Sequence, residues 1–157
     1  MVTRRGTVGE LLISYKMTKK SQIADFIIQT TRNRLVFCHE KIEDLKFDNI
    51  GKSLAEYLKN EDINSNTIAY NAEDFLIETL SNTNNDSTIG QYVAIDNIGI
   101  LFEPDLGFNI KSIFDNTSRD KAFIICSDAQ IKNNFLYFLQ EGDITYVDLN
   151  GLSYIEL

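Results

Sequence analysis

The sequence predicts an α/β protein built in three layers, with a mainly parallel sheet covered by helices on both faces and a C-terminal β-hairpin. Short apolar runs alternate with amphipathic segments along the chain, which is the pattern of β-α units. The run at 92–95 (YVAI) lacks charge, as a strand buried on both faces does. Asn150-Gly151, between two β-rich segments, suits the type I′ turn of a hairpin.

The first half of the chain predicts strands and helices in alternation. Ser21 is a candidate N-cap for a helix in which Ile23, Phe26 and Ile27 share one face. The expected elements are this helix, a strand at 35–38, a charged loop at 39–50, a helix at 52–60, a strand at 67–70, a helix at 72–80 and a polar loop at 81–88.

The second half continues the alternation. A buried strand ends at Asp96, and Pro104 and Gly107 interrupt the chain before a helix that carries Ile110, Ile113 and Phe114 on its inner face. The remaining expected elements are a strand at 122–126, a fifth helix at 129–140 and a hairpin over 143–157.

Length and composition indicate one globular domain. The chain has 157 residues, of which 43% are hydrophobic, and no apolar run approaches the ~20 residues that span a membrane. Cys38 and Cys126 lie inside apolar runs, so we expect buried, reduced thiols and a cytoplasmic location. With one histidine and no clustered cysteines, a zinc site is not expected.

The charge of the chain divides it into a tail and a body. Residues 1–20 carry five basic residues and one acid, a balance of +4. Because the whole chain has a net charge of −8, the remaining residues carry −12. Residues 1–16 are therefore expected to form a basic tail, either disordered or preceding a natural start at Met17, and 17–157 a single domain. Direct binding of nucleic acid by the acidic body is not expected.

Polar residues follow the predicted strands at the edge where ligands bind in open α/β sheets. These residues are His39, Asn71, Asp96-Asn97 and Ser127-Asp128. Arg119 precedes a strand, which places it at the opposite edge. It could act as an arginine finger only across a subunit interface.

Gly51-Lys52-Ser53 opens an amphipathic segment, and the triplet is also the end of a phosphate-binding P-loop. In that role, Lys52 neutralises phosphate charge and Ser53 ligates Mg²⁺. The first glycine of the motif is replaced by Lys46, and bulky or acidic residues fill 47–50. The alternative is that Gly51 ends a loop and Lys52-Ser53 start an ordinary helix.

Asp96, at the end of a buried strand, matches the acid that holds a Mg²⁺-bound water in P-loop proteins. Together, Gly51, Lys52, Ser53, Asp96, Asn97 and Ser127 form a candidate site for ATP, with Ser53 and Asp96 as its metal ligands. Asn97 stands where a water-activating glutamate is common, and an amide cannot accept a proton, so at most a weak ATPase is expected. Alternatively, Asp96 caps a turn, and Ser127-Asp128 cap the fifth helix rather than sense a γ-phosphate.

The run YVAIDNIGILFEPDLGFNIKSIFDNTSRDKAFIICS (92–127) resembles the Walker B region of a small P-loop protein family of bacterial BREX phage-defence loci, called BrxF. The matching features are Asp96, Asn97, Ile98, Leu101, Phe102, Pro104, Ser118 and Arg119, with Thr145-Tyr146 near the end of the chain. The resemblance implies a fold of P-loop NTPase type and a cytoplasmic component of an anti-phage system that acts with larger protein subunits. The family carries an intact Walker A loop, from which this chain departs.

Three functions follow as hypotheses. The first is a degenerate P-loop-like accessory or assembly subunit, with weak or absent nucleotide hydrolysis. The second is an ATP-binding switch that a homo-oligomer completes, with Arg119 supplied by a neighbour. The third is a plain protein-interaction module without a ligand, which a collapsed 39–50 loop would favour.

Overall fold

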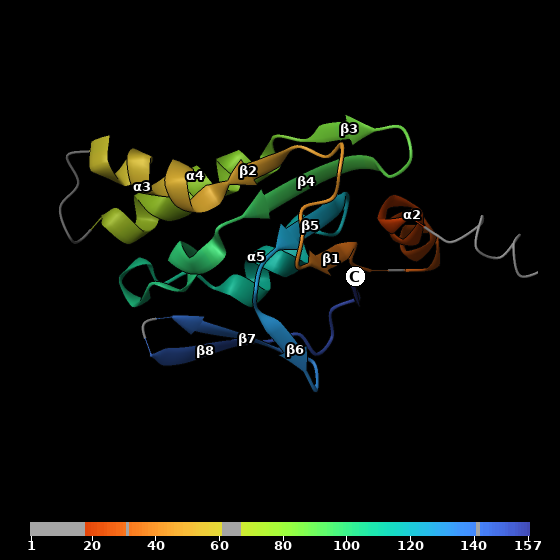
Figure 1. Cartoon of the computed structure of the whole chain (residues 1–157). Helices are drawn as coiled ribbons and strands as arrows, with labels where there is room; N and C mark the ends of the chain where they lie inside the picture. Colours follow the sequence, from red (N-terminus) through yellow and green to blue (C-terminus); the bar gives the residue numbers. More distant parts are fainter. Residues whose placement is uncertain (1–17, 31, 61–66, 141) are drawn as a thin grey trace, which may run out of the picture.

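The computed structural model describes residues 18–30, 32–60, 67–140 and 142–157 and confirms an α/β architecture with a mainly parallel sheet (Figure 1). Sheet A has six strands, with β2, β4, β5, β1 and β9 neighbouring in that order and β3 also paired to β4. Only β3 runs antiparallel. Its strands are β1 (Leu35–Cys38), β2 (Phe47–Asn49), β3 (Asn84–Asp86), β4 (Gly90–Asp96), β5 (Ala122–Cys126) and β9 (Tyr154–Glu156).

A separate antiparallel sheet and the helices complete the fold. Sheet B orders its three strands as β6, β7 and β8, whose bounds are Gln130–Lys132, Phe135–Gln140 and Asp143–Asp148. The helices are α2 (Lys19–Gln29), α3 (Ile50–Asn60), α4 (Ile68–Ser81) and α5 (Ile110–Thr117), with 3-10 turns η1 (Ile98–Phe102) and η2 (Pro104–Leu106). No helix among the described residues has the length and apolar content to cross a bilayer.

Alternate residues of the strands of sheet A pack against opposite layers. Val36 and Ile124 belong to the cluster that Ile23 of α2 covers. Leu35 and Phe123 belong to the core cluster on the other face of the sheet. Residues of α4, α5 and sheet B also belong to that cluster. Burial on both faces explains why β1 and β5, to which these four strand residues belong, are wholly apolar.

The first correction concerns 67–70, expected to be a strand. These residues lie at the start of α4, which runs from Ile68 to Ser81 and carries the expected helix 72–80 within it. Ala72, Leu76 and Leu80 are buried at a spacing of four, so tertiary packing along one helix face decides the structure. Asn71 is therefore a helix residue and does not follow a strand.

The second correction concerns 129–140, expected to be a helix. This segment forms β6 and β7, joined by Asn133-Asn134, which both adopt a left-handed conformation with φ of 52° and 64°. Positive φ at both central residues is the requirement of a two-residue type I′ turn, and asparagine tolerates it. The tight hairpin lies here and continues into β8.

The predicted hairpin over 143–157 is also wrong. Of the two central residues Asn150 and Gly151, only Gly151 has positive φ, so the turn closed by Leu152 N–H and the Leu149 carbonyl is not type I′. Instead, β8 pairs with β7, and β9 leaves to pair in parallel with β1.

Two smaller differences affect the start of the chain. Helix α2 begins at Lys19 with Thr18 as N-cap, whose side chain accepts a hydrogen bond from the N–H of Ser21, the expected cap. The loop expected at 39–50 includes strand β2 and the first residue of α3. The predicted basic tail, 1–16, lies outside the described residues.

Candidate functional site at the carboxyl ends of the parallel strands

A hollow of about 360 Å³ lies where β1, β4 and β5 end. Most of the residues predicted for this edge contribute to it: His39 follows β1, Asn97 follows β4, and Ser127-Asp128 follow β5. Phe138 and Leu139 of β7 line the hollow too, so sheet B forms part of its wall. The edge is thus polar toward sheet A and apolar toward sheet B.

His39 and Ser127 are fixed by hydrogen bonds across the hollow. The ring Nδ1 of His39 lies 3.0 Å from the carbonyl oxygen of Ser127. A carbonyl oxygen only accepts, so Nδ1 of His39 is the donor of this hydrogen bond. Ser127 Oγ accepts from the N–H of Ala129, 3.0 Å away, and the N–H of Ser127 donates to the carbonyl of Cys38. Because β6 rather than a helix follows, Ser127 closes a turn and is not a helix cap.

Asp96 forms an ion pair that the sequence reading did not include. Its Oδ2 lies 2.9 Å from Nζ of Lys41, and the Asp96 side chain is 17% exposed while that of Lys41 is 61% exposed. The hydrogen bond to Asp96 raises the pKa of Lys41. The other oxygen, Oδ1, is buried without a hydrogen-bond partner. A buried carboxylate oxygen left unpaired is costly, so this position is suited to receive a donor or cation.

Three of the residues that would form the phosphate loop are part of the sheet. Phe47, Asp48 and Asn49 pair in parallel with Ala94, Ile95 and Asp96, and helix α3 begins directly after them at Ile50. A phosphate loop instead turns several free N–H groups inward between its strand and its helix. Moreover, the strand before Gly51 is β2, which β4 and β5 separate from β1.

Two asparagine side chains cover the start of α3. Oδ1 of Asn49 accepts from the N–H of Lys52 at 2.9 Å and from Nδ2 of Asn97 at 2.8 Å. Gly51 lies against Asn97, because a Cβ there would be 2.4 Å from its Nδ2 and 2.6 Å from its carbonyl oxygen. The glycine is required by this close approach. A phosphate at the same place would have to displace the side chain of Asn49.

The side chains near Gly51-Lys52-Ser53 and Asp96 offer few ligands for the ATP and Mg²⁺ that the motif and the resemblance imply. No group of three or more His, Cys, Asp or Glu residues able to hold a metal occurs in the part of the chain that the structure describes. Lys41 already neutralises one oxygen of Asp96, and Lys52, although exposed, begins a capped helix. The residues present do not fit a bound nucleoside triphosphate unless the side chain of Asn49 moves.

Arg119 is engaged within its own chain. Its Nε and one terminal nitrogen contact the two oxygens of Asp115 at 3.2 and 2.8 Å. It precedes β5, at the opposite edge of sheet A from the hollow, as the topology predicted. Use of Arg119 by a neighbouring subunit would require this two-point contact to break.

The two cysteines lie side by side at the ends of β1 and β5, where they are direct partners in the sheet. Both are free, Cys38 is buried, and Cys126 is partly buried and lines the hollow. Burial raises the pKa of Cys38 to about 12 and also raises that of Cys126. Both are therefore protonated and weakly nucleophilic near neutral pH.

Sequence reasoning missed Asn49 and Lys41, because both fell in the segment taken as a loop. A signal for Asn49 was present, since asparagine three residues before Lys52 is a favoured N-cap. Lys41 carried no local signal, because its partner Asp96 is far away in the sequence.

Comparison with protein-family models, with curated proteins and with solved structures gives no match for this chain.

Proposed function

We propose that this protein is an accessory or assembly subunit on a degenerate P-loop-like scaffold, with nucleotide binding weak or absent. The observation that carries the proposal is the start of α3. There β2 stands where a phosphate loop would be, and Oδ1 of Asn49 accepts the hydrogen bond of the Lys52 N–H. The third hypothesis, a plain interaction module without a ligand, shares this observation, because a collapsed 39–50 loop was the feature expected of it.

The proposed scaffold keeps the order of parts at the carboxyl ends of the parallel strands. Asp96 ends β4, Ser127 follows β5, and β5 lies between β4 and β1. An acid and a polar residue on neighbouring strands are the arrangement that the P-loop reading requires. On the resemblance at 92–127, the partners of the subunit are other proteins of a bacterial anti-phage defence complex.

Isothermal titration of ATP·Mg²⁺ tests this proposal. We expect no saturable heat with the wild-type protein up to about 1 mM nucleotide, which corresponds to a binding free energy weaker than about −4 kcal/mol. Micromolar binding that Lys52→Ala abolishes would overturn the proposal. Lys59→Ala, which removes an exposed lysine at the other end of α3, is the matched control.

A second candidate function, an ATP-binding switch, is favoured by the unpartnered Oδ1 of Asp96. In that case nucleotide would replace Lys41 at the carboxylate and displace Asn49 from Lys52. Mg²⁺-dependent turnover that rises with protein concentration and is lost in Asp96→Ala would support the switch. Turnover that is absent at every protein concentration would exclude it.

A further inference from the structure

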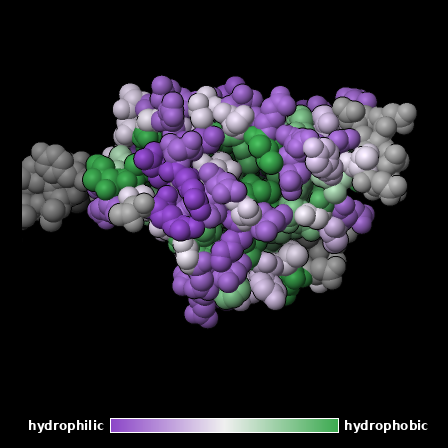
Figure 2. Space-filling view, turned by 180° about the vertical axis from the view of Figure 1, so that it is seen from behind, coloured by the Kyte–Doolittle hydropathy of each residue, from purple (hydrophilic) through white to green (hydrophobic). Residues whose placement is uncertain are grey.

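The outer face of sheet B exposes apolar side chains, of which, among the described residues, Leu139 alone also lines the hollow at the carboxyl ends of the parallel strands. This outer face consists of Phe135, Tyr137, Leu139, Ile144 and Tyr146. Seven large hydrophobic residues are exposed among the described residues, and four of them belong to this face: Tyr137 (38% exposed), Leu139 (69%), Ile144 (65%) and Tyr146 (64%). Seen from behind, the surface is mostly hydrophilic, with apolar groups between the polar ones (Figure 2).

The strand register explains why these side chains gather. Tyr137 is opposite Tyr146, and Leu139 is opposite Ile144, so the two pairs occupy the same side of the β7–β8 hairpin. Phe135 completes an aromatic group, with its ring 5.7 Å from Tyr146 and 6.4 Å from Tyr137. The alternate residues Leu136 and Val147 are buried against the core. Sheet B thus uses one face for folding and presents the other to the outside.

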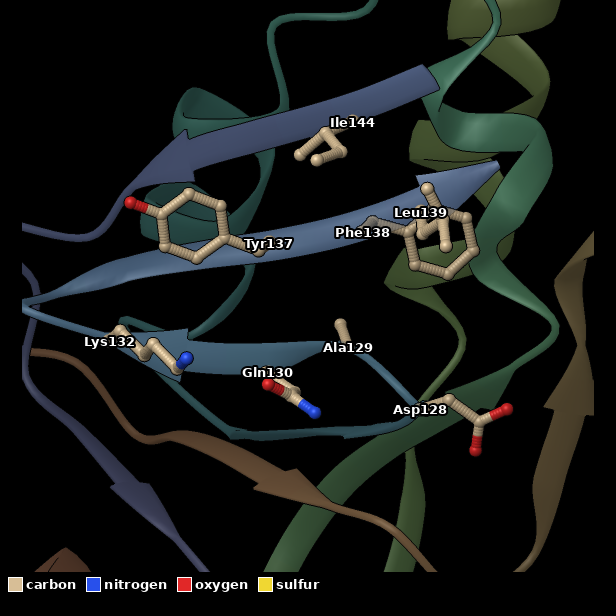
Figure 3. Close-up of a pocket in the computed structure, with 8 residues that line it drawn as sticks. All are labelled: Asp128, Ala129, Gln130, Lys132, Tyr137, Phe138, Leu139 and Ile144. Carbon is tan, nitrogen blue, oxygen red and sulfur yellow. The ribbon is translucent and has the colours of Figure 1, made fainter. Parts of the chain in front are cut away.

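The outer face contains a hollow with opposite charges at its ends. The hollow measures about 660 Å³, and its apolar lining includes Tyr137, Leu139 and Ile144. Lys132 lies at one end and Asp128 at the other (Figure 3). Both charged residues are exposed, and neither belongs to the buried core. Tyr146 does not line the hollow but projects from the same side of the hairpin, beside it.

This arrangement of charge is complementary to itself. When two copies of such a face meet about a two-fold axis with their strands antiparallel, each end of one copy meets the opposite end of the other. Lys132 then lies against Asp128 of the partner subunit, and the same pair forms a second time. Tyr146 of each copy is placed to enter the hollow of the other, as a buried aromatic anchor of an interface does.

Other occupants fit the face less well. Nucleic acid would stack on the aromatic rings, but Lys132 is the only basic side chain among the described residues that line the hollow, and the chain has a net charge of −8. A different protein would need the same order of apolar middle and charged ends, which a second copy supplies by symmetry. We propose that the outer face of sheet B is a homodimer interface, with Lys132 and Asp128 pairing reciprocally between subunits.

Charge reversal with rescue by mixing tests this proposal by sedimentation velocity. We expect the wild-type protein to form dimers in a concentration-dependent manner. Lys132→Glu and Asp128→Lys should each weaken dimerisation at least tenfold, because both copies of the pair become repulsive. An equimolar mixture of the two variants should restore dimers, since each heterodimer contains two attractive pairs.

Several results would overturn the proposal. These are a wild-type protein that remains monomeric at every concentration, single variants that dimerise like the wild type, and a mixture that stays monomeric. Lys59→Glu, a charge reversal on α3, is the control and should dimerise normally. Circular dichroism confirms that each variant is folded.

Tyr146→Ser should also weaken the dimer. A wild-type protein that stays monomeric and binds single-stranded oligonucleotides would instead assign the face to nucleic acid. The nucleotide titration is a separate measurement, so its outcome is independent of this one.

Discussion

Replacing Gly51 by alanine is the sharpest probe of the closed α3 start. Alanine is favoured over glycine within a helix by about 1 kcal/mol, so helix propensity alone predicts a gain in stability. The structure predicts the opposite, because the added Cβ would lie 2.4 Å from Nδ2, 2.7 Å from Cγ and 2.6 Å from the carbonyl oxygen of Asn97. The last of these atoms belongs to the backbone, between β4 and η1, and cannot rotate away.

The expected magnitude follows from the two effects that oppose propensity. Overpacking of this kind costs about 1–3 kcal/mol, and movement of Asn97 also loses its hydrogen bond to Asn49, worth about 1 kcal/mol. After the propensity gain, Gly51→Ala should lower the free energy of unfolding by about 1–3 kcal/mol. Urea denaturation followed by circular dichroism measures it, with Ser53→Ala in the same helical turn as the control.

A double variant separates the side chain of Asn97 from its backbone. Asn97 has a left-handed conformation with φ of 54°, so glycine fits this position without strain. In an Asn97→Gly background, two of the three close contacts disappear, and the cost of Gly51→Ala should fall by about 1 kcal/mol. A Gly51→Ala protein as stable as the wild type, or more stable, would refute the close approach of Asn97 and with it the argument for a closed helix start.

Two further predictions concern titrating groups. Hydrogen bonds from Arg119, Asn33 and Arg32 hold the pKa of Asp115 well below its ordinary value, so its contribution to stability is present above about pH 4 and is lost as the pH falls. The free energy of unfolding should therefore decline on acidification below about pH 4, and less steeply in Asp115→Asn; equal slopes in urea titrations of the two proteins would contradict this. Burial raises the pKa of Cys38 to about 12, so at pH 8 a thiol reagent should modify Cys126 first and Cys38 only at the rate of unfolding. Rapid labelling of two thiols in the native protein, or unchanged labelling in Cys126→Ala, would show that these groups are more accessible than the structure places them.

The parallel sheet was predictable where a strand is buried on both faces. Strand β1, strand β5 and the stretch 92–95 of β4 are short, uniformly apolar runs, and such runs leave few alternatives. The secondary structure of segments with one buried face was harder to predict. Ile68-Ala69-Tyr70 has β-forming residues but continues into α4, and Phe135 to Leu139 has apolar residues at helical spacing but alternates in burial as a strand. In each case distant packing partners decided the structure.

The candidate site, too, was predictable from the sequence only in part. Chain topology alone was enough to bring His39, Asn97 and Ser127 to one hollow, because parallel strands end at one edge. The geometry of Gly51-Lys52-Ser53 was not predictable from the triplet, since it depends on β2 pairing with β4 and on Asn49 reaching both α3 and Asn97. Contacts between residues far apart in sequence leave no local pattern.

The position of β1 between β5 and β9 has a consequence for synthesis of the chain. Both of its neighbours come from the C-terminal part, so β1 emerges from the ribosome long before either partner exists. Until then its four residues, all buried in the finished protein, present two open strand edges to other chains. Cellular factors that shield nascent chains should therefore matter most for this protein before residue 122 is made. Shortening the chain ahead of β9 should yield aggregates rather than a smaller folded domain.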